Sequence, residues 1–200
     1  MVTLRTVYKE VIDPLYYVLK EQVKEKNNFI PQKILDIGAW NGFFTRICKM
    51  IVWPNAHYTC IEAGKKHEKK LNDIAEQVHI EVLGDSNRDC IMYTNEIGYT
   101  KGASLFDKTD YADKRKMKTL ETVVGKDATY DFIKSDVQGA ELMIMKGSPA
   151  IFQRAQYVML EVQLLQAEEI DTFMKGLGFN KSIIVPKKVY TEMDKIYWKG

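Results

Sequence analysis

The first segment of the chain repeats apolar residues at spacings of three and four, the pattern of an amphipathic helix. This stripe runs from Leu4 to Val23. Asp13 followed by Pro14 predicts that the helix restarts within the stripe. Aspartate suits the position before a helix, and proline suits the first helical position. We therefore expect residues 1–30 to form short N-terminal helices.

From Lys33 onward, short apolar runs alternate with helical stretches. The runs have the length of strands, and each ends in a polar or glycine-bearing turn, as buried parallel strands do. The predicted strands are 33–37, 57–62, 78–83, 131–136 and 157–162. The predicted helices are 42–52, 65–77, 140–146, ending near Gly147 to Pro149, and 166–175. Two last apolar runs, 179–185 and 196–198, predict a terminal antiparallel pair.

Strands that alternate with helices predict a doubly wound α/β fold, with a parallel sheet covered by helices on both faces. Residues 88–118 interrupt the alternation, and we expect an inserted hairpin or loop there, in which 90–93 pairs with 102–106. Since no linker or repeat divides the chain, residues 1–200 are expected to form a single domain.

Composition narrows the class of protein. The chain is 46% hydrophobic and 28% charged, which is typical of a globular protein. A net charge of +2 argues against a dedicated partner among nucleic acids or membrane surfaces. Three scattered cysteines favour a reducing compartment over a disulfide framework. Because the sequence contains no apolar run long enough to span a bilayer and acidic residues interrupt the N-terminal stretch, a cytoplasmic location is expected.

The turn after the first predicted strand indicates the type of cofactor. A dinucleotide fingerprint needs glycines at three positions, so that a pyrophosphate can approach the helix N-terminus. Counting from Gly38, Trp40 and Phe43 stand where the second and third glycines belong. Bulky side chains there disfavour NAD. S-adenosylmethionine has no phosphate, but its ammonium, carboxylate and ribose need polar partners.

In open α/β sheets, ligands bind beyond the carboxyl ends of the strands. We expect Asp36 to face the ammonium group, and backbone N–H groups between Gly38 and Gly42 to receive the carboxylate. Glu62 is expected to accept hydrogen bonds from the ribose hydroxyls, and Asp85 with Ser86 to reach the adenine. The alternative is that the segment from Asp36 to Gly38 is only a strand end and a tight turn. The full expected cofactor set is Asp36, Gly38, Ala39, Asn41, Gly42, Phe43, Glu62, Ala63, Asp85, Ser86 and Asp136.

Four segments carry a resemblance to one family. Residues 131–147, DFIKSDVQGAELMIMKG, are similar to the motif D-x-x-K-x-D-V-E-G-A-E-x-x-x-L-K-G. DIGAWNGFFT resembles D-[IV]-G-A-N-x-G-x-[YF]-[ST], CIEAGKKHEKKL resembles F-E-P-x-P-x-x-x-x-x-L, and residues 102–105 resemble G-x-S-L. Together these segments resemble the FkbM-type methyltransferases, a branch of the class I fold. The departures from the family pattern are Trp40, Ala63, Ser135, Gln138 and Met145.

The resemblance implies a Rossmann-like, seven-stranded, mostly parallel sheet with one antiparallel strand. It also implies S-adenosylmethionine as cofactor and methyl transfer to a hydroxyl oxygen of a sugar or secondary metabolite. No separate substrate domain is visible, so the expected partner is a small-molecule or glycan acceptor bound by the 88–118 insert and the loops after the fourth and fifth strands.

Catalytic candidates follow from the chemistry of a hydroxyl acceptor, which is a poor nucleophile until a base draws its proton away. Asp136 is the expected base, although an aspartate here can also cap the helix that follows. Glu161 can line the acceptor pocket or bind a metal together with Asp136; we expect no resident metal. Glu141 is expected to have a supporting role, in which it hydrogen-bonds backbone or orients its neighbours. Lys134 is either buried against a carboxylate or extended to the sheet edge.

The leading hypothesis is therefore an O-methyltransferase. A module that binds S-adenosylmethionine without catalysis is the main alternative, and an NAD-dependent oxidoreductase is a weaker third. The basic run Lys114 to Lys118 suits an anionic acceptor, or else forms a solvated loop.

Overall fold

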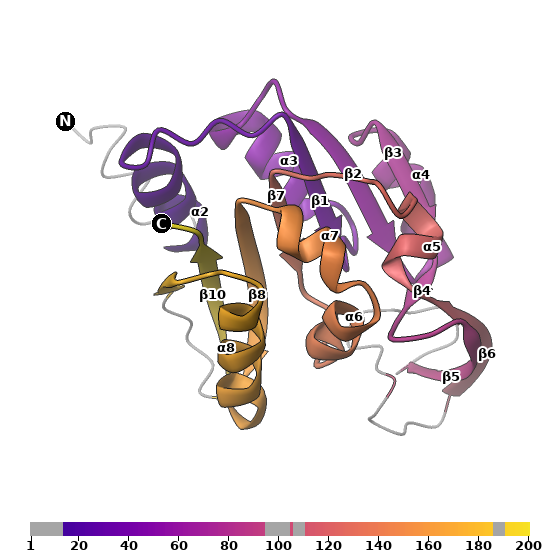
Figure 1. Ribbon diagram of the computed structural model, residues 1–200. Coiled ribbons are helices and arrows are strands. Elements are labelled where there is room, and N and C mark those ends of the chain that lie inside the picture. The colour runs from indigo at the N-terminus through magenta and orange to yellow at the C-terminus, as the bar shows by residue number, and fades with distance from the viewer. Residues whose placement is uncertain (1–13, 95–104, 106–110, 186–190) are drawn as a thin grey trace.

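The computed structural model describes residues 14–94, 105, 111–185 and 191–200. Its centre is a seven-stranded sheet (Figure 1). The strands lie in the order β3 (Gln77–Ile80), β2 (His57–Glu62), β1 (Lys33–Ile37), β7 (Phe132–Ser135), β8 (Tyr157–Gln163), β10 (Glu192–Trp198) and β9 (Lys181–Val185). The strand order runs in opposite directions from β1, which places the topological switch point between β1 and β7.

The pairings confirm the predicted doubly wound sheet. β1 lies parallel to β2 and β7, and β7 lies parallel to β8. β10 is antiparallel to both of its neighbours, β8 and β9. It is the antiparallel strand that the resemblance implies.

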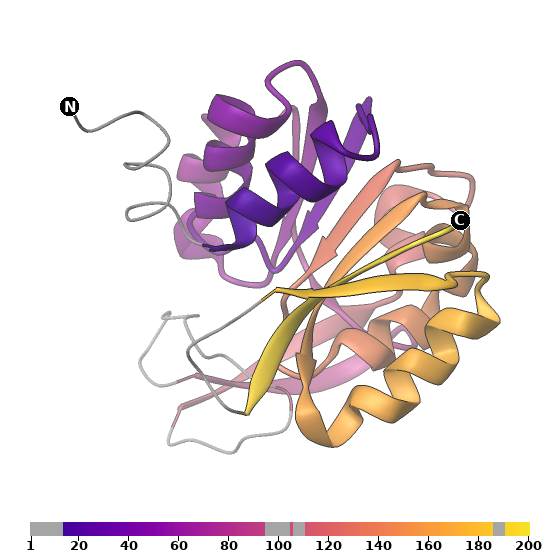
Figure 2. The same ribbon diagram turned by 90° about the vertical axis from the view of Figure 1, so that its left-hand side faces the viewer.

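Helices cover both faces of this sheet (Figure 2). One face carries α2 (Pro14–Val18) with its continuation η1 (Leu19–Glu25), α3 (Phe43–Ile47) with η2 (Cys48–Val52), and α4 (Glu68–Asn72), which follows the short turn η3 (Lys65–His67). The other face carries α5 (Leu120–Val124), α6 (Glu141–Gly147), α7 (Pro149–Arg154) and α8 (Ala167–Gly176), which follows η4 (Leu164–Gln166). The predicted N-terminal helices are present over 14–25, and residues 1–13 lie outside the described part.

The two faces follow from the alternation of side chains along each strand. In β1, Ile34 packs with the N-terminal helices, whereas Leu35 and Ile37 pack with α6, α7 and α8. Because both faces of the central strands are buried, β1 and β8 read in the sequence as largely apolar runs.

The predicted third strand is divided between two sheets. Residues 77–80 form β3 of the main sheet, and after Glu81 the chain enters β4 (Val82–Leu83) of a second, three-stranded sheet. There β4 lies parallel to β6 (Tyr111–Lys118), which pairs antiparallel with β5 (Arg88–Thr94). This small sheet lies beyond the edge at which β2 ends (Figure 1).

The expected partner of 90–93 was therefore wrong: the pairing strand is 111–118, and not 102–106. β6 exposes most of its polar side chains, so it lacks the apolar run that announces a buried strand. Of the residues 102–106, the structure describes only Leu105.

The helices differ from the prediction in three places. The helix expected over 65–77 ends at Asn72. The helix expected over 140–146 ends at Gly147, as predicted, but Pro149 then begins a further helix, α7, since proline is well suited to the first helical turn. α5 was not predicted; Thr119 caps it by accepting a hydrogen bond from the N–H of Thr122. Among the described helices, none is long and apolar enough to cross a bilayer.

Candidate functional site

The turn after β1 lies directly against the chain that leaves β7. Gly38 has φ +71°, and a Cβ atom there would lie 1.8 Å from the backbone oxygen of Asp136. The N–H groups of Gly38 and Ala39 donate to the carbonyl of Ile61, at 2.9 and 3.1 Å. Glycine is therefore required at position 38, both for its backbone angle and for this close approach.

Asp36 lies beneath this turn and is fully buried. Its Oδ2 accepts a hydrogen bond of 2.8 Å from the Thr45 hydroxyl, and its Oδ1 lies 3.0 Å from Nζ of Lys134. Lys134 also donates to the carbonyl of Gly38 at 2.8 Å. In this structure the Asp36 carboxylate is thus engaged within the protein, and it acts on the turn through Lys134.

Lys134 is buried and paired with a carboxylate, which was one of its two predicted roles. Burial alone would lower the pKa of its ammonium group, but the charge and hydrogen bond of Asp36, together with the charges of Asp136 and Glu62, outweigh burial and raise that pKa. The lysine therefore remains a cation inside the sheet.

Glu62 ends β2 and presents a nearly buried carboxylate at the same edge, 7% exposed. Its two oxygens accept hydrogen bonds of 2.7 Å from the N–H groups of Trp40 and Gly64. Burial raises its pKa above the ordinary value. A carboxylate oxygen has two lone pairs, so each of these oxygens can still accept a hydroxyl. This pair of acceptor oxygens fits the vicinal hydroxyls of a ribose.

The remaining residues of the turn hold its shape. Ala39 is buried in a small cluster with Cys60 and Leu71. The Asn41 side chain accepts a hydrogen bond of 3.1 Å from the N–H of Phe43, at the start of α3.

Two further residues of the turn face the helices beside it. Gly42 has φ +78°, and a Cβ there would lie 2.2 Å from the side chain of Ile74. The Phe43 ring is half exposed, and its centroid lies 6.1 Å from that of Tyr16. Phe43 thus contacts α2.

Asp85 and Ser86 follow β4 and so belong to the start of the small sheet. Asp85 is exposed, and it accepts hydrogen bonds from Ser86 at 2.9 Å and from Arg88 at 2.6 Å. The end of α6 packs closely here, since a Cβ on Gly147 would lie 2.6 Å from the Cα of Asp85. A second link ties the small sheet to the main one: Arg115 donates to the carbonyl of Ala63 at 3.0 Å.

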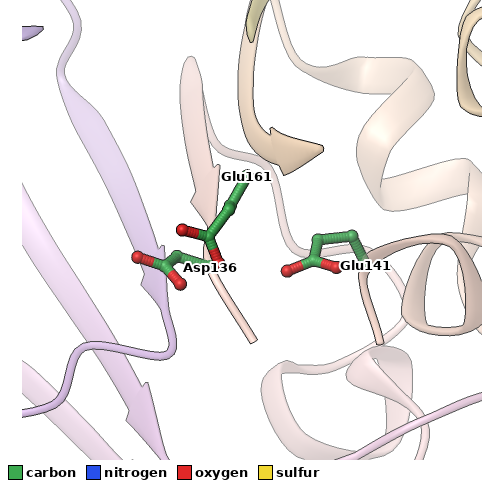
Figure 3. A group of neighbouring side chains, drawn as sticks. All are labelled: Asp136, Glu141 and Glu161. Atoms are coloured by element: carbon green, nitrogen blue, oxygen red, sulfur yellow. The ribbon is translucent and has the colours of Figure 1, made fainter. Parts of the chain in front are cut away.

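Three carboxylates meet at the carboxyl edge of β7 and β8: Asp136, Glu141 and Glu161. One oxygen from each lies within 4.8 Å of the others. Figure 3 shows Asp136 and Glu161 side by side, with the Glu141 carboxylate turned toward them from α6. The Gln138 amide joins two of them, donating to Asp136 at 3.2 Å and to Glu161 at 2.8 Å.

Glu141 is fully buried within this cluster. Its Oε1 accepts a hydrogen bond of 2.8 Å from the N–H of Val137, which is the backbone support that the sequence predicted. Burial raises the pKa of Glu141 to about 7. The prediction paired only Asp136 with Glu161. Nothing in the sequence grouped Glu141 with these two residues, because Glu141 is the first residue of a helix and the residues after it, 142–145, are apolar.

Gln138 was noted in the sequence only as a departure from the family's usual Glu. Its backbone has φ +55°, a left-handed angle that few residues other than glycine adopt. That angle accompanies the placement of its amide between Asp136 and Glu161. A glutamate has no N–H to donate to either carboxylate. The departure from the motif was therefore the available signal for this role.

Most of the chain matches one known protein family. The model of the Methyltransferase FkbM domain matches residues 36–181. A search of curated proteins found no significant match.

Solved structures show the same fold at low identity. The ribosomal protein L11 methylase from Lactobacillus delbrueckii subsp. bulgaricus is 12% identical, with a TM-score of 0.53 over 91% of this chain and 77% of that chain. The N-terminal domain of human METTL16 in complex with SAH is 10% identical, with a TM-score of 0.51 over 93% and 69%. The family match extends from Asp36, near the end of β1, to the start of β9 and includes all three carboxylates. The chain therefore belongs to the FkbM methyltransferase family, and its cofactor is S-adenosylmethionine.

Proposed function

We propose that the protein is an O-methyltransferase that methylates a hydroxyl group of a sugar or another small polar metabolite. The observation that carries this proposal is the contact between Gly38 and the backbone of Asp136. It joins the turn after β1 to the edge of β7 and β8 where the three carboxylates lie, here called the acidic edge. A methyl donor held by the turn and a methyl acceptor held by the carboxylates would therefore be neighbours.

The proposed cofactor contacts start from Glu62, whose carboxylate would bind the ribose hydroxyls. Asp85 and Ser86 are proposed to lie near the adenine. Asp36 is proposed to act indirectly, because Lys134 connects its carboxylate to the Gly38 carbonyl. The N–H groups of Gly38, Ala39 and Trp40 already donate within the protein.

S-adenosylmethionine supplies a methyl group on a sulfonium, which is a good leaving group. The protein's main task is therefore alignment of the acceptor oxygen with the S–CH₃ bond, which can contribute about 7–11 kcal/mol. Asp136 would take the hydroxyl proton as the new O–CH₃ bond forms and the S–CH₃ bond breaks. A placed base of this kind typically adds about 10²–10⁴-fold.

The acidic edge also bears on the class of acceptor. Glu161 is 4% exposed and Glu141 is fully buried, so their charges are poorly screened by solvent. A polyanionic chain would be repelled from such an edge, whereas hydroxyl groups are good donors to carboxylates. This favours a small hydroxylated acceptor over a nucleic acid.

The proposal is tested by transfer of a labelled methyl group to a panel of sugars, small hydroxylated metabolites and RNA. Label in a sugar or metabolite, with turnover lost in Asp136→Asn, supports it. Glu169→Gln is the matched control, since Glu169 lies on the exposed face of α8 and pairs only with Lys146 among the ion pairs described. Label that enters RNA alone would contradict the acceptor class.

A cofactor-binding module without catalysis is the remaining alternative. It would bind S-adenosylhomocysteine, giving a thermal shift that Glu62→Ala abolishes, and yet transfer no methyl group to any acceptor. A saturating ligand at a hundredfold excess over its Kd adds about 2.7 kcal/mol to the native state, which moves the unfolding midpoint by several degrees.

A further inference from the structure

The three carboxylates at the edge of β7 and β8 present an electrostatic problem. Asp136, Glu141 and Glu161 offer oxygens within 4.8 Å of one another, and two of the three residues are buried. Asp194, also buried, stands opposite Glu161 in the register of β10. Like charges brought together out of water are destabilising unless a positive charge or protons compensate for them.

Neighbouring groups compensate in part: the charge of Lys134 acts on Asp136, and hydrogen bonds come from the Gln138 amide. The amide donates one hydrogen bond to Asp136 and one to Glu161. The Glu141 carboxylate accepts a hydrogen bond from Val137, and the backbone of Gly139 and of Glu141 also acts on it, but its second oxygen is buried with no hydrogen-bond partner among the described residues. Such an oxygen is rare in a protein interior and calls for a ligand. Figure 3 shows that the Glu141 carboxylate points toward the other two.

The spacing of the oxygens identifies the class of ligand. Two oxygens bound to one ion can be separated by at most twice the metal–oxygen distance, which is about 4.2 Å for Mg²⁺ and about 4.6–5.2 Å for Ca²⁺. The 4.8 Å limit allows one ion at the centre of the three carboxylates, with a small inward movement of the oxygens for Ca²⁺ and a larger one for Mg²⁺. A donor set of oxygens alone selects hard cations such as Mg²⁺, Mn²⁺ and Ca²⁺.

We propose that Asp136, Glu141 and Glu161 form a binding site for one hard divalent cation at the carboxyl edge of the sheet. The sequence did not predict Glu141 as a ligand. This residue adds a third carboxylate, from helix α6, to the two that lie at the ends of β7 and β8. Water or an acceptor oxygen would complete the coordination. Gln138 positions two of the ligands through its amide group.

The role of the ion rests on the proposed function. An ion held here lies beside Asp136, where the acceptor hydroxyl is expected, and a hydroxyl bound to it loses its proton more readily. The binding of the ion itself does not depend on methyl transfer, so it can be tested without cofactor or acceptor.

The experiment uses the full chain, freed of metal by a chelator and titrated with Mn²⁺. Electron paramagnetic resonance of free Mn²⁺ measures the bound fraction. We expect one ion per chain with a Kd below about 1 mM, displaced by Mg²⁺ or Ca²⁺. Glu141→Gln and Glu161→Gln should each weaken binding at least about tenfold, while the exposed Glu169→Gln should bind as the natural protein does.

Glu141→Gln keeps an oxygen that can accept from Val137, so it is expected to fold, and circular dichroism checks this. If it does not fold, Glu161→Gln decides the question. No bound Mn²⁺ at 1 mM, or equal affinity in both cluster variants and the natural protein, would overturn the proposal and leave shared protons as the compensation. If Mn²⁺ binds but no acceptor is methylated, the site stands and the proposed function fails.

Discussion

Lys134 and Asp36 form a buried ion pair of 3.0 Å beneath the turn that leaves β1. Lys134 is contributed by β7 and Asp36 by β1, and the two residues are also partners in the strand register. The lysine also donates to the carbonyl of Gly38. A single ammonium group therefore holds the Asp36 carboxylate and the turn after β1 in place, and links β1 to β7.

Replacing Lys134 by Met removes this cation and leaves Asp36 as an uncompensated buried charge. We expect the free energy of unfolding to fall by about 3–5 kcal/mol, measured by urea denaturation. Lys146→Met is the matched control. It breaks an exposed pair with Glu169, and its expected effect is below about 1 kcal/mol. Equal effects of the two substitutions would contradict the structural role given to Lys134.

Gly38→Ala should prevent the close approach of the turn to Asp136. The new Cβ would lie 1.8 Å from a backbone oxygen, at a backbone angle that alanine rarely adopts. We expect a loss of more than about 3 kcal/mol of stability, together with loss of the thermal shift caused by S-adenosylhomocysteine.

Gly176→Ala serves as the control for Gly38→Ala. Gly176 is the last residue of α8, and a Cβ there meets nothing within 4 Å. Alanine should raise stability by about 0.4–1 kcal/mol and leave the ligand shift unchanged. A tolerated alanine at position 38 would refute the packing of this turn.

Gln138→Glu should destabilise the carboxylate cluster, because it removes two donated hydrogen bonds and adds a further negative charge. The expected loss is about 1–3 kcal/mol in chelator. Gln138→Met removes the donors without adding charge, so the difference between the two variants isolates the charge. Addition of Mn²⁺ should restore Gln138→Glu more than Gln138→Met, and no recovery in either variant would indicate that no cation reaches the cluster.

A stabilising contact that depends on pH joins α8 to β10. Asp171 accepts hydrogen bonds from Lys195, at 2.7 and 2.8 Å, and from the hydroxyl of Tyr197, at 2.7 Å. Burial alone would raise the pKa of Asp171, but these hydrogen bonds outweigh it and lower the pKa below its ordinary value. The stabilisation is therefore present above the unfolded pKa of about 3.9, and is lost as pH falls through the lower folded value.

Asp171→Asn should remove this contribution, which we expect to be about 1–2 kcal/mol, since Asp171 is partly exposed. Thermal unfolding at pH 7 and pH 3 measures it. The variant should lie below the natural protein at pH 7, and the difference should shrink at pH 3. A constant difference at both values would show that the hydrogen bonds persist after protonation.

The main sheet could be predicted because its central strands are buried on both faces. Ile34 and Leu35 point to opposite cores, so the apolar run in β1 is visible without any knowledge of its partners. The small sheet could not be predicted in the same way. Lys114 and Lys116 of β6 are exposed, and an exposed strand is specified by its pairing and not by an apolar pattern.

The candidate site was predictable to the extent that strand ends converge. Glu62 and Asp136 follow two strands whose carboxyl ends share an edge, and that rule brings them into one region. Glu141 lies on a helix, and its direction depends on how α6 packs against the sheet. For this reason the prediction gave it a supporting role and could not place it with Glu161.

Thr94 and Tyr111 form the last pair of β5 and β6, whereas Arg115 binds Ala63 from within the same strand. The other pairs of β5 with β6, and the hydrogen bond from Arg115 to the main sheet, therefore all lie outside the segment between residues 94 and 111. Changes in length between residues 94 and 111 would leave them intact. The length of the connection between the two strands can therefore vary in related sequences without any change to the pairing of β5 with β6 or to the contact of Arg115 with Ala63.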